Sequence, residues 1–182
     1  MMSESIELTV AELAKLTEEV RAPGGPPKDA QHTKRFNEAM VAALRAGKGH
    51  IDGELSAIPL LILTNKGAKS GVKRENPLAY FVVDNRLFVV ASMGGADINP
   101  PWYNNVVANP DVVVEINGVA FPAVAKTVGP PEYEHIYSEV CKVLPVFKDY
   151  KERTKRVIPV VELAASRADI AESLAAHSSG RT

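Results

Sequence analysis

The feature that most restricts the fold of this chain is a succession of apolar segments without regular alternation of strand and helix. The six segments, which their composition and the flanking turn residues identify as β-strands, are residues 60–64, 72–83, 86–91, 111–116, 119–128 and 157–163. Asn117-Gly118, between the fourth and fifth segments, is typical of a two-residue β-hairpin turn. Pro122 predicts that the fifth strand lies at an edge or contains a bulge, because proline donates no ladder hydrogen bond.

This order of segments excludes a Rossmann sheet. Such a sheet needs repeated strand-helix-strand units and a Gly-x-Gly-x-x-Gly opening, and the sequence contains neither. Six mostly antiparallel strands predict an α+β fold, in which an antiparallel barrel carries helices on its outside. We expect an N-terminal helical extension at residues 1–50, the barrel at 51–163 and a C-terminal tail at 164–182.

Apolar spacing and capping residues predict the helices. They are expected at residues 9–21, at about 36–47, and at 99–109, 130–144 and 147–156. Asn99 is predicted to cap the third of them, and residues 148–156 are predicted to form a solvated helix face. The first helix is rich in glutamate, whereas a membrane-surface helix is usually basic. We therefore expect it to pack on its own domain or on a partner subunit, with peripheral membrane contact as the alternative.

Composition narrows the classes of function. A net charge of -1 gives no global attraction to nucleic acid, so anion binding requires a local cluster. The single cysteine, Cys141, forms no intramolecular disulfide and fits a reducing cytoplasm. The N-terminus lacks the basic start and following apolar segment of a signal peptide, and no apolar run is long enough for a membrane span. None of the four histidines (His32, His50, His135 and His177) has a second ligand at metal-like spacing, so we expect no metal.

Two short motifs favour a ligand site. Lys66, Lys69, Lys73 and Arg74 crowd around a glycine-bounded turn, which suits an anionic ligand, although a solvated hairpin tip is the alternative. After the third strand, the small residues at 91–95 allow close approach of the backbone to a ligand.

These motifs occur in a larger pattern. It consists of Lys69-Ser70-Gly71-x-x-Arg74-x-x-Pro77-Leu78, Ala91-Ser92-x-Gly94-Gly95, Pro101-Trp102-Tyr103-x-Asn105 and Ala108-Asn109-Pro110. In this order the motifs resemble the deazaflavin (F420)-dependent nitroreductase family over roughly residues 60–163. The resemblance implies a six-stranded, mostly antiparallel split β-barrel with flanking helices. It also implies coenzyme F420, a deazaflavin with a phosphate and an oligoglutamate tail, as cofactor.

The resemblance further implies which residues surround the ligands. The cofactor-binding residues would be Ala68, Lys69, Ser70, Arg74, Glu75, Asn76, Pro77, Leu78, Ala79, Val90, Ala91, Ser92, Met93, Gly94, Gly95, Pro101, Trp102, Tyr103, Asn104 and Asn105. The substrate pocket would be lined by Ala79, Leu144, Phe147 and Tyr150. Pro77 and Leu78 would form an apolar wall for the flat ring. Trp102 offers either a ring face or a core anchor, and by itself it favours the anchor.

The chemistry implied is hydride transfer from reduced F420 to a small hydrophobic acceptor: a quinone, an activated alkene such as an enone or lactone, or a nitroaromatic compound. Ser92 and Tyr150 are the candidate catalytic donors for the charge that develops on the acceptor oxygen. The alternatives are a non-catalytic F420 carrier and an FMN-binding reductase on the same barrel. We expect a cytoplasmic monomer or homodimer.

Overall fold

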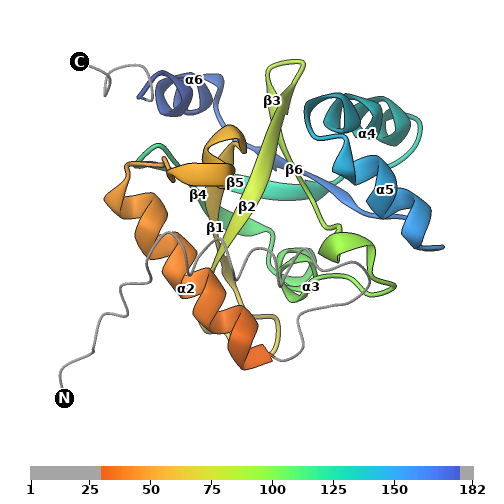
Figure 1. Ribbon diagram of the computed structural model, residues 1–182, viewed down its shortest axis with the longest axis horizontal. Coiled ribbons are helices and arrows are strands. Elements are labelled where there is room, and N and C mark those ends of the chain that lie inside the picture. Colours follow the sequence, from red (N-terminus) through yellow and green to blue (C-terminus); the bar gives the residue numbers. More distant parts are fainter. Residues whose placement is uncertain (1–29, 177–182) are drawn as a thin grey trace.

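The computed structural model describes residues 30–176, whose strands form one closed β-barrel (Figure 1). The strands are β1 (Leu60–Lys66), β2 (Lys73–Val83), β3 (Arg86–Val90), β4 (Asp111–Ile116), β5 (Val119–Thr127) and β6 (Val160–Ala164). Their order around the barrel is β1-β2-β3-β6-β5-β4, and every neighbouring pair is antiparallel. The predicted α+β fold with a six-stranded antiparallel barrel is confirmed.

Alternate strand residues fill the interior of the barrel. Leu61 and Leu63 of β1 and Leu87 and Val89 of β3 belong to one apolar cluster, and each is at most 1% exposed. Their burial stabilises the fold by roughly 1.5–3 kcal/mol for each side chain. Because successive strand residues point to opposite faces, the residues between them, such as Phe88, point outward toward the surrounding helices.

One end of the barrel collects the segments that the sequence motifs single out. The antiparallel order places the ends of β1, β3 and β5 beside the starts of β2, β4 and β6. Helix α3 (Pro101–Ala108) lies at this end (Figure 1), where Trp102 and Val106 are buried in the barrel core. The β1–β2 turn and the short 3-10 helix η2 (Met93–Gly95) lie at the same end, which we call the α3 end.

The remaining helices lie on the outside of the barrel, except that the last of them packs Ile170 into the barrel core. They are α2 (Ala30–Ala46), α4 (Glu132–Val143), α5 (Val146–Arg153) and α6 (Arg167–Ala175), with a 3-10 helix η1 (Gly53–Ala57) before β1. Helix α2 packs Met40 and Leu44 against Ile62 of β1. Helices α4 and α5 pack against the outward residues of β2 and β3, such as Phe81 and Phe88. The two sides of β2 are therefore flanked by different helices (Figure 1).

Several predicted boundaries are shifted, most of all the start of α2, which lies at Ala30 rather than at about residue 36. Strand β6 begins at Val160 rather than at residue 157, because Val157 is 72% exposed and Pro159 lies between them. Helix α5 ends at Arg153, three residues before its predicted end. The predicted two-residue hairpin is present, with Asn117 and Gly118 both at positive φ, as a type I′ turn requires.

Two predictions about single residues have different outcomes. Asn99 does not cap α3: Pro100 is the N-cap residue, and the Asn99 side chain instead accepts a hydrogen bond from Arg156. Pro122 lies outside the ladder between β5 and β6, which joins β5 residues 124–127 to β6. In a closed barrel this position still behaves as a local edge, because no β6 residue pairs with Pro122 there.

The predicted helix at residues 9–21 and the linker at 22–27 lie outside the described residues. The division of the chain into residues 1–50, 51–163 and 164–182 remains a prediction. Between residues 30 and 176, no helix combines the length and the apolar character needed to cross a bilayer.

Candidate functional site

The basic turn between β1 and β2 is closed by its own backbone. Gly67 donates to the Val72 carbonyl at 2.8 Å, and Gly71 donates to the Gly67 carbonyl at 2.9 Å. The Ser70 hydroxyl accepts from the Val72 amide at 3.2 Å. The turn is therefore held in one shape before any ligand binds.

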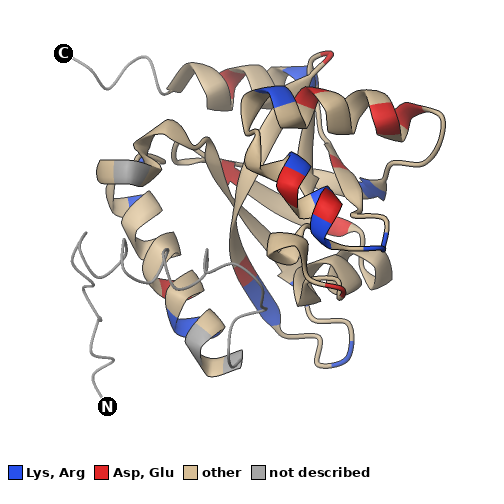
Figure 2. Ribbon diagram, turned by 45° about the vertical axis from the view of Figure 1, so that its right-hand side comes forward, with Lys and Arg blue, Asp and Glu red and all other residues tan. Residues whose placement is uncertain are grey.

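Three cations at this turn are exposed and have no carboxylate partner within the described residues: Lys66, Lys69 and Arg74. Figure 2 shows basic residues at the turn and at the start of β2. Lys73, the fourth member of the predicted cluster, differs because its Nζ pairs with Glu75 at 3.2 Å. The charge available to an anionic ligand therefore comes from Lys66, Lys69 and Arg74.

Glu75 is the centre of a surface network that sequence reasoning did not predict. Arg45 of α2 donates to Glu75 at 2.8 Å and to Glu115 of β4 at 3.0 Å, so it spans β1. The hydrogen bond from Arg45, with that from Lys73, holds the pKa of the Glu75 carboxyl below its usual value, against the effect of burial. This network ties α2 to the barrel beside the basic turn.

Helix α3 holds the turn through two asparagines. The Ala68 amide donates to Asn105 Oδ1 at 3.0 Å, and Asn105 Nδ2 donates to Asn65 Oδ1 at 3.1 Å. Asn109 Nδ2 adds a bond of 3.5 Å to the Lys66 carbonyl. Asn65 is only 3% exposed, and its Nδ2 has no partner within the described residues. Sequence reasoning missed Asn65, although it continues the inward alternation of Leu61 and Leu63.

The segment after β3 has an unusual backbone. Met93, Gly94 and Gly95 all have positive φ, at 49°, 64° and 83°. A Cβ atom on Gly95 would lie 3.0 Å from the Tyr150 carbonyl oxygen, so α5 packs directly on this glycine. At Gly95 the close approach is made to α5, and close approach of this backbone to a ligand stays a prediction.

Arg156 holds this segment by hydrogen bonds. Its guanidinium donates to the Ala96 carbonyl at 2.7 Å, to Asn99 Oδ1 at 2.7 Å, to the Ala91 carbonyl at 3.1 Å and to the Ser92 carbonyl at 2.8 Å. The prediction that residues 148–156 only form a solvated helix face is wrong at this position. No local sequence signal distinguishes Arg156 from its charged neighbours, because its partners lie about 60 residues earlier in the chain.

The outer face of β2 connects the turn to α4 and α5. Pro77 and Ala79 point outward and are half-buried, whereas Leu78 packs against the barrel core. The predicted wall of Pro77 and Leu78 is therefore corrected, because adjacent strand residues point to opposite faces. Trp102 is 6% exposed within the core, which confirms its interpretation as an anchor.

The four predicted substrate-pocket residues lie in one apolar cluster. Phe147 is buried, and Ala79, Leu144 and Tyr150 are half-buried and pack against the same cluster. The rings of Phe147 and Tyr150 meet edge to face at 5.3 Å between centroids. Within the described residues, the hydroxyl groups of Tyr150 and Ser92 have no hydrogen-bond partner, so both remain able to donate to a ligand.

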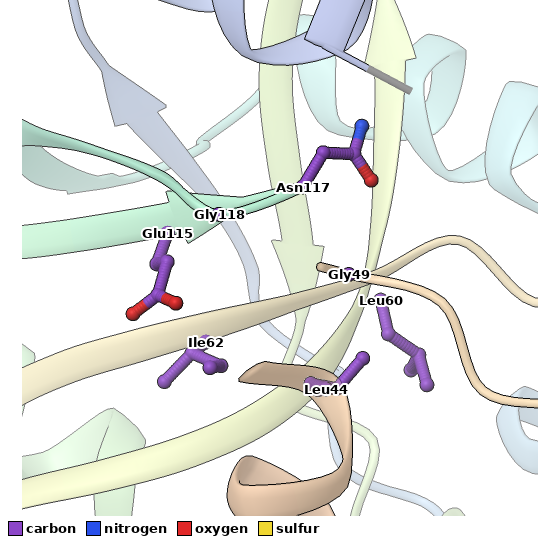
Figure 3. Close-up of a pocket in the computed structure, with 7 residues that line it drawn as sticks. All are labelled: Leu44, Gly49, Leu60, Ile62, Glu115, Asn117 and Gly118. Atoms are coloured by element: carbon purple, nitrogen blue, oxygen red, sulfur yellow. The ribbon is translucent and has the colours of Figure 1, made fainter. Parts of the chain in front are cut away.

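Two cavities in the structure are lined by residues other than those predicted for the site. A cavity of about 10 Å³, large enough for about one water molecule, lies between the end of α2, β1 and the Asn117-Gly118 turn (Figure 3). A second, of about 190 Å³, lies at the α3 end and is lined by Val106, Val107, Pro110, Ala125, Thr127 and Val161. Neither is lined by a predicted cofactor or substrate residue. Within residues 30–176, no three potential metal-ligating side chains gather.

Comparison with known proteins identifies relatives over most of the chain. The family model of F420H(2)-dependent quinone reductase matches residues 35–164. An F420H(2)-dependent quinone reductase of Mycobacterium tuberculosis is 35% identical over 133 residues, which cover 71% of this chain and 87% of the relative.

Solved structures agree with these sequence matches. An F420-H2 dependent reductase is 36% identical and covers 58% of this chain and 93% of its own, with a TM-score of 0.54. A structure described as a domain-swapped dimer is 31% identical and covers 71% of this chain and 95% of its own, with a TM-score of 0.56.

Proposed function

This chain belongs to the family of F420H(2)-dependent quinone reductases, and we propose that its physiological electron acceptor is a quinone. The family assignment makes it an enzyme with reduced coenzyme F420 as hydride donor. It agrees with the resemblance to deazaflavin-dependent reductases. The carrier and FMN-binding alternatives are therefore set aside.

The observation that carries the site assignment is the group of three exposed cations without carboxylate partners in the described residues, Lys66, Lys69 and Arg74. By alternation along β2, Arg74 shares its face of the strand with the half-buried Leu78, whereas Pro77 and Ala79 lie on the opposite face. A phosphate and several carboxylates need fixed cations, and a flat ring needs an apolar surface. The turn supplies the cations, and Leu78 supplies apolar surface on the face of β2 that also carries Arg74. The residues present fit the cofactor.

When bound, reduced F420 supplies a hydride from its deazaflavin ring. The protein must hold the acceptor at about 3–3.5 Å from that ring and keep water away. Ala79, Leu144, Phe147 and Tyr150 form one apolar cluster that can position a flat quinone. Enones, lactones and nitroaromatic compounds are further proposed acceptors, because they share the flat shape and an electron-poor carbon or nitrogen.

Negative charge develops on an acceptor oxygen as the hydride arrives, and a hydrogen-bond donor must stabilise it. Ser92 and Tyr150 are the proposed donors. The packing of Gly95 against the Tyr150 backbone brings their two segments together. Each hydroxyl lacks a protein partner in the described part of the chain, so donation to a ligand breaks no existing bond.

Turnover with menadione tests this proposal. The wild-type protein should oxidise reduced F420 when menadione is added, and Tyr150→Phe should lower kcat by roughly 10- to 100-fold, as expected for one lost donor. Tyr133→Phe is the matched control, because the Tyr133 hydroxyl donates to the Ile158 carbonyl at 2.9 Å beneath α4. Wild-type protein that binds F420 but oxidises it with no quinone would contradict the proposed acceptor.

A further inference from the structure

The segment that carries Ser92 is in a conformation that its own sequence does not favour. Met93 has a φ of 49°, and it is followed by two glycines that also have positive φ. A non-glycine residue in the left-handed region costs of order 1–3 kcal/mol, and it persists only where the surroundings determine it. The conformation of this segment must therefore come from contacts with the rest of the protein.

Arg156 makes four hydrogen bonds to this segment. Two of its four bonds go to the carbonyls of Ala91 and Ser92, immediately before Met93, and the other two go to Ala96 and Asn99, after Gly95. One planar guanidinium thus donates hydrogen bonds to residues on both sides of the strained turn. We propose that Arg156 is a positioning residue for hydride transfer, which holds the Ser92 hydroxyl where it meets the ligands. This inference rests on the proposed function.

The hydrogen bonds around Arg156 support a role in shape rather than in charge pairing. Its acceptors are three carbonyl oxygens and one amide oxygen, and no carboxylate pairs with it in the described part of the chain. Burial lowers the pKa of Arg156 from its usual value, while the charge of Asp97 opposes that shift. Burying a cation without a salt bridge costs folding free energy. The four hydrogen bonds of Arg156 offset this cost by fixing the backbone around Ser92.

A second contact makes the arrangement rigid. The Thr154 hydroxyl donates to Asp97 Oδ1 at 2.6 Å and accepts from the Arg156 amide at 3.2 Å. Residues 154–156 and 91–99 are therefore joined at several points. The Ser92 carbonyl points toward Arg156, so in the planar trans peptide the following N–H points the opposite way. The backbone around Ser92 thus has one fixed orientation.

Lysine cannot replace this arginine. Its ammonium keeps the charge but lacks the planar fork that reaches several acceptors at once. Arg156→Lys should therefore keep the local charge while it releases the turn. We expect kcat with reduced F420 and menadione to fall at least about tenfold, with a smaller change in the dissociation constant of F420.

Ser92→Ala, made in the wild-type protein and in the Arg156→Lys variant, tests whether Arg156 acts through Ser92. The single variants should each lower kcat, and the double variant should be no worse than Arg156→Lys alone, because Ser92 is then already misplaced. A purely structural role would give multiplicative effects of the two substitutions, and that result would overturn the inference. Asn99→Ala removes one acceptor of Arg156 and should show a weaker form of the same non-additivity; it serves as the test if Arg156→Lys does not fold.

Arg86→Lys is the matched control. Arg86 is another half-buried arginine with several bonds, but it lies at the start of β3, away from the α3 end. It should lose thermal stability without loss of kcat. An active wild type with an unchanged Arg156→Lys would remove the inference alone, whereas an inactive wild type would remove the proposed function, and the inference with it.

Discussion

Arg86 and Arg156 are both half-buried and multiply hydrogen-bonded, but their partners differ. Arg86 donates to Glu162 at 2.9 and 2.7 Å and also to Glu132, and it lies 5.1 Å from the centre of the Phe88 ring. Among the residues that the structure describes, Arg156 bonds only to neutral oxygens. The two regions therefore serve different purposes. Carboxylates pair with the cation at the start of β3, whereas carbonyl oxygens and one amide oxygen accept from the cation near the α3 end.

The same contrast extends to the surface. At the α3 end, Lys66, Lys69 and Arg74 lack carboxylate partners within residues 30–176, whereas Arg45 and Lys73 beside them share Glu75. A cation paired with a carboxylate contributes to the stability of the fold and attracts an anionic ligand only weakly. An unpaired cation adds little to stability and remains able to bind an anionic ligand. We therefore expect substitutions of paired cations to lower the free energy of unfolding, and substitutions of unpaired cations to weaken F420 binding.

The largest expected effect on stability comes from Arg86→Met. It leaves Glu162 and Glu132 without their cation, which should lower the free energy of unfolding by about 2–3 kcal/mol, less than for a fully buried pair. Urea unfolding measures the loss. The dissociation constant of F420 should stay at the wild-type value, and weaker F420 binding in this variant would break the comparison.

Arg74→Ala should have the converse effect. The loss of a charge-assisted hydrogen bond to a phosphate or carboxylate should weaken F420 binding roughly 10- to 100-fold, which corresponds to about 1.5–3 kcal/mol. Fluorescence titration of F420 measures the affinity. Lys73→Ala, next in the chain but paired with Glu75, is the matched control and should weaken binding much less. Equal effects of the two substitutions would contradict the assignment of Arg74.

The smallest expected effect is in the acid range. The hydrogen bond from Arg86 holds the pKa of the Glu162 carboxyl below its usual value in the folded state. Ionised Glu162 therefore favours folding above its unfolded pKa of about 4.3, and this contribution is lost as the pH falls through the folded value. Glu162→Gln should be less stable than wild type by about 1 kcal/mol at pH 7, and the two unfolding free energies should converge toward pH 3. Parallel curves would show that the pair contributes nothing.

Local motifs and the resemblance predicted the basic turn, the small residues after β3 and the four pocket residues as parts of the site. The structure places these segments at or beside one end of the barrel, and their role in binding stays a prediction. Asn65, Arg45 and Arg156 were missed. Their partners lie 40, 70 and about 60 residues away, and no local pattern records such contacts.

The six strands, their mostly antiparallel character and the hairpin at Asn117-Gly118 follow from the sequence, because side-chain alternation and turn residues act over a few positions. The order of the strands around the barrel, with β1 beside β4 and β3 beside β6, was decided by the tertiary structure. Which cations remain unpaired was decided only by the tertiary structure. Lys73 and Arg74 are neighbours of similar chemistry, yet alternation along β2 brings only Lys73 to Glu75. Likewise, Arg156 becomes an anchor because the chain returns at β6 beside the end of β3, which brings its guanidinium to Ala91 and Ser92.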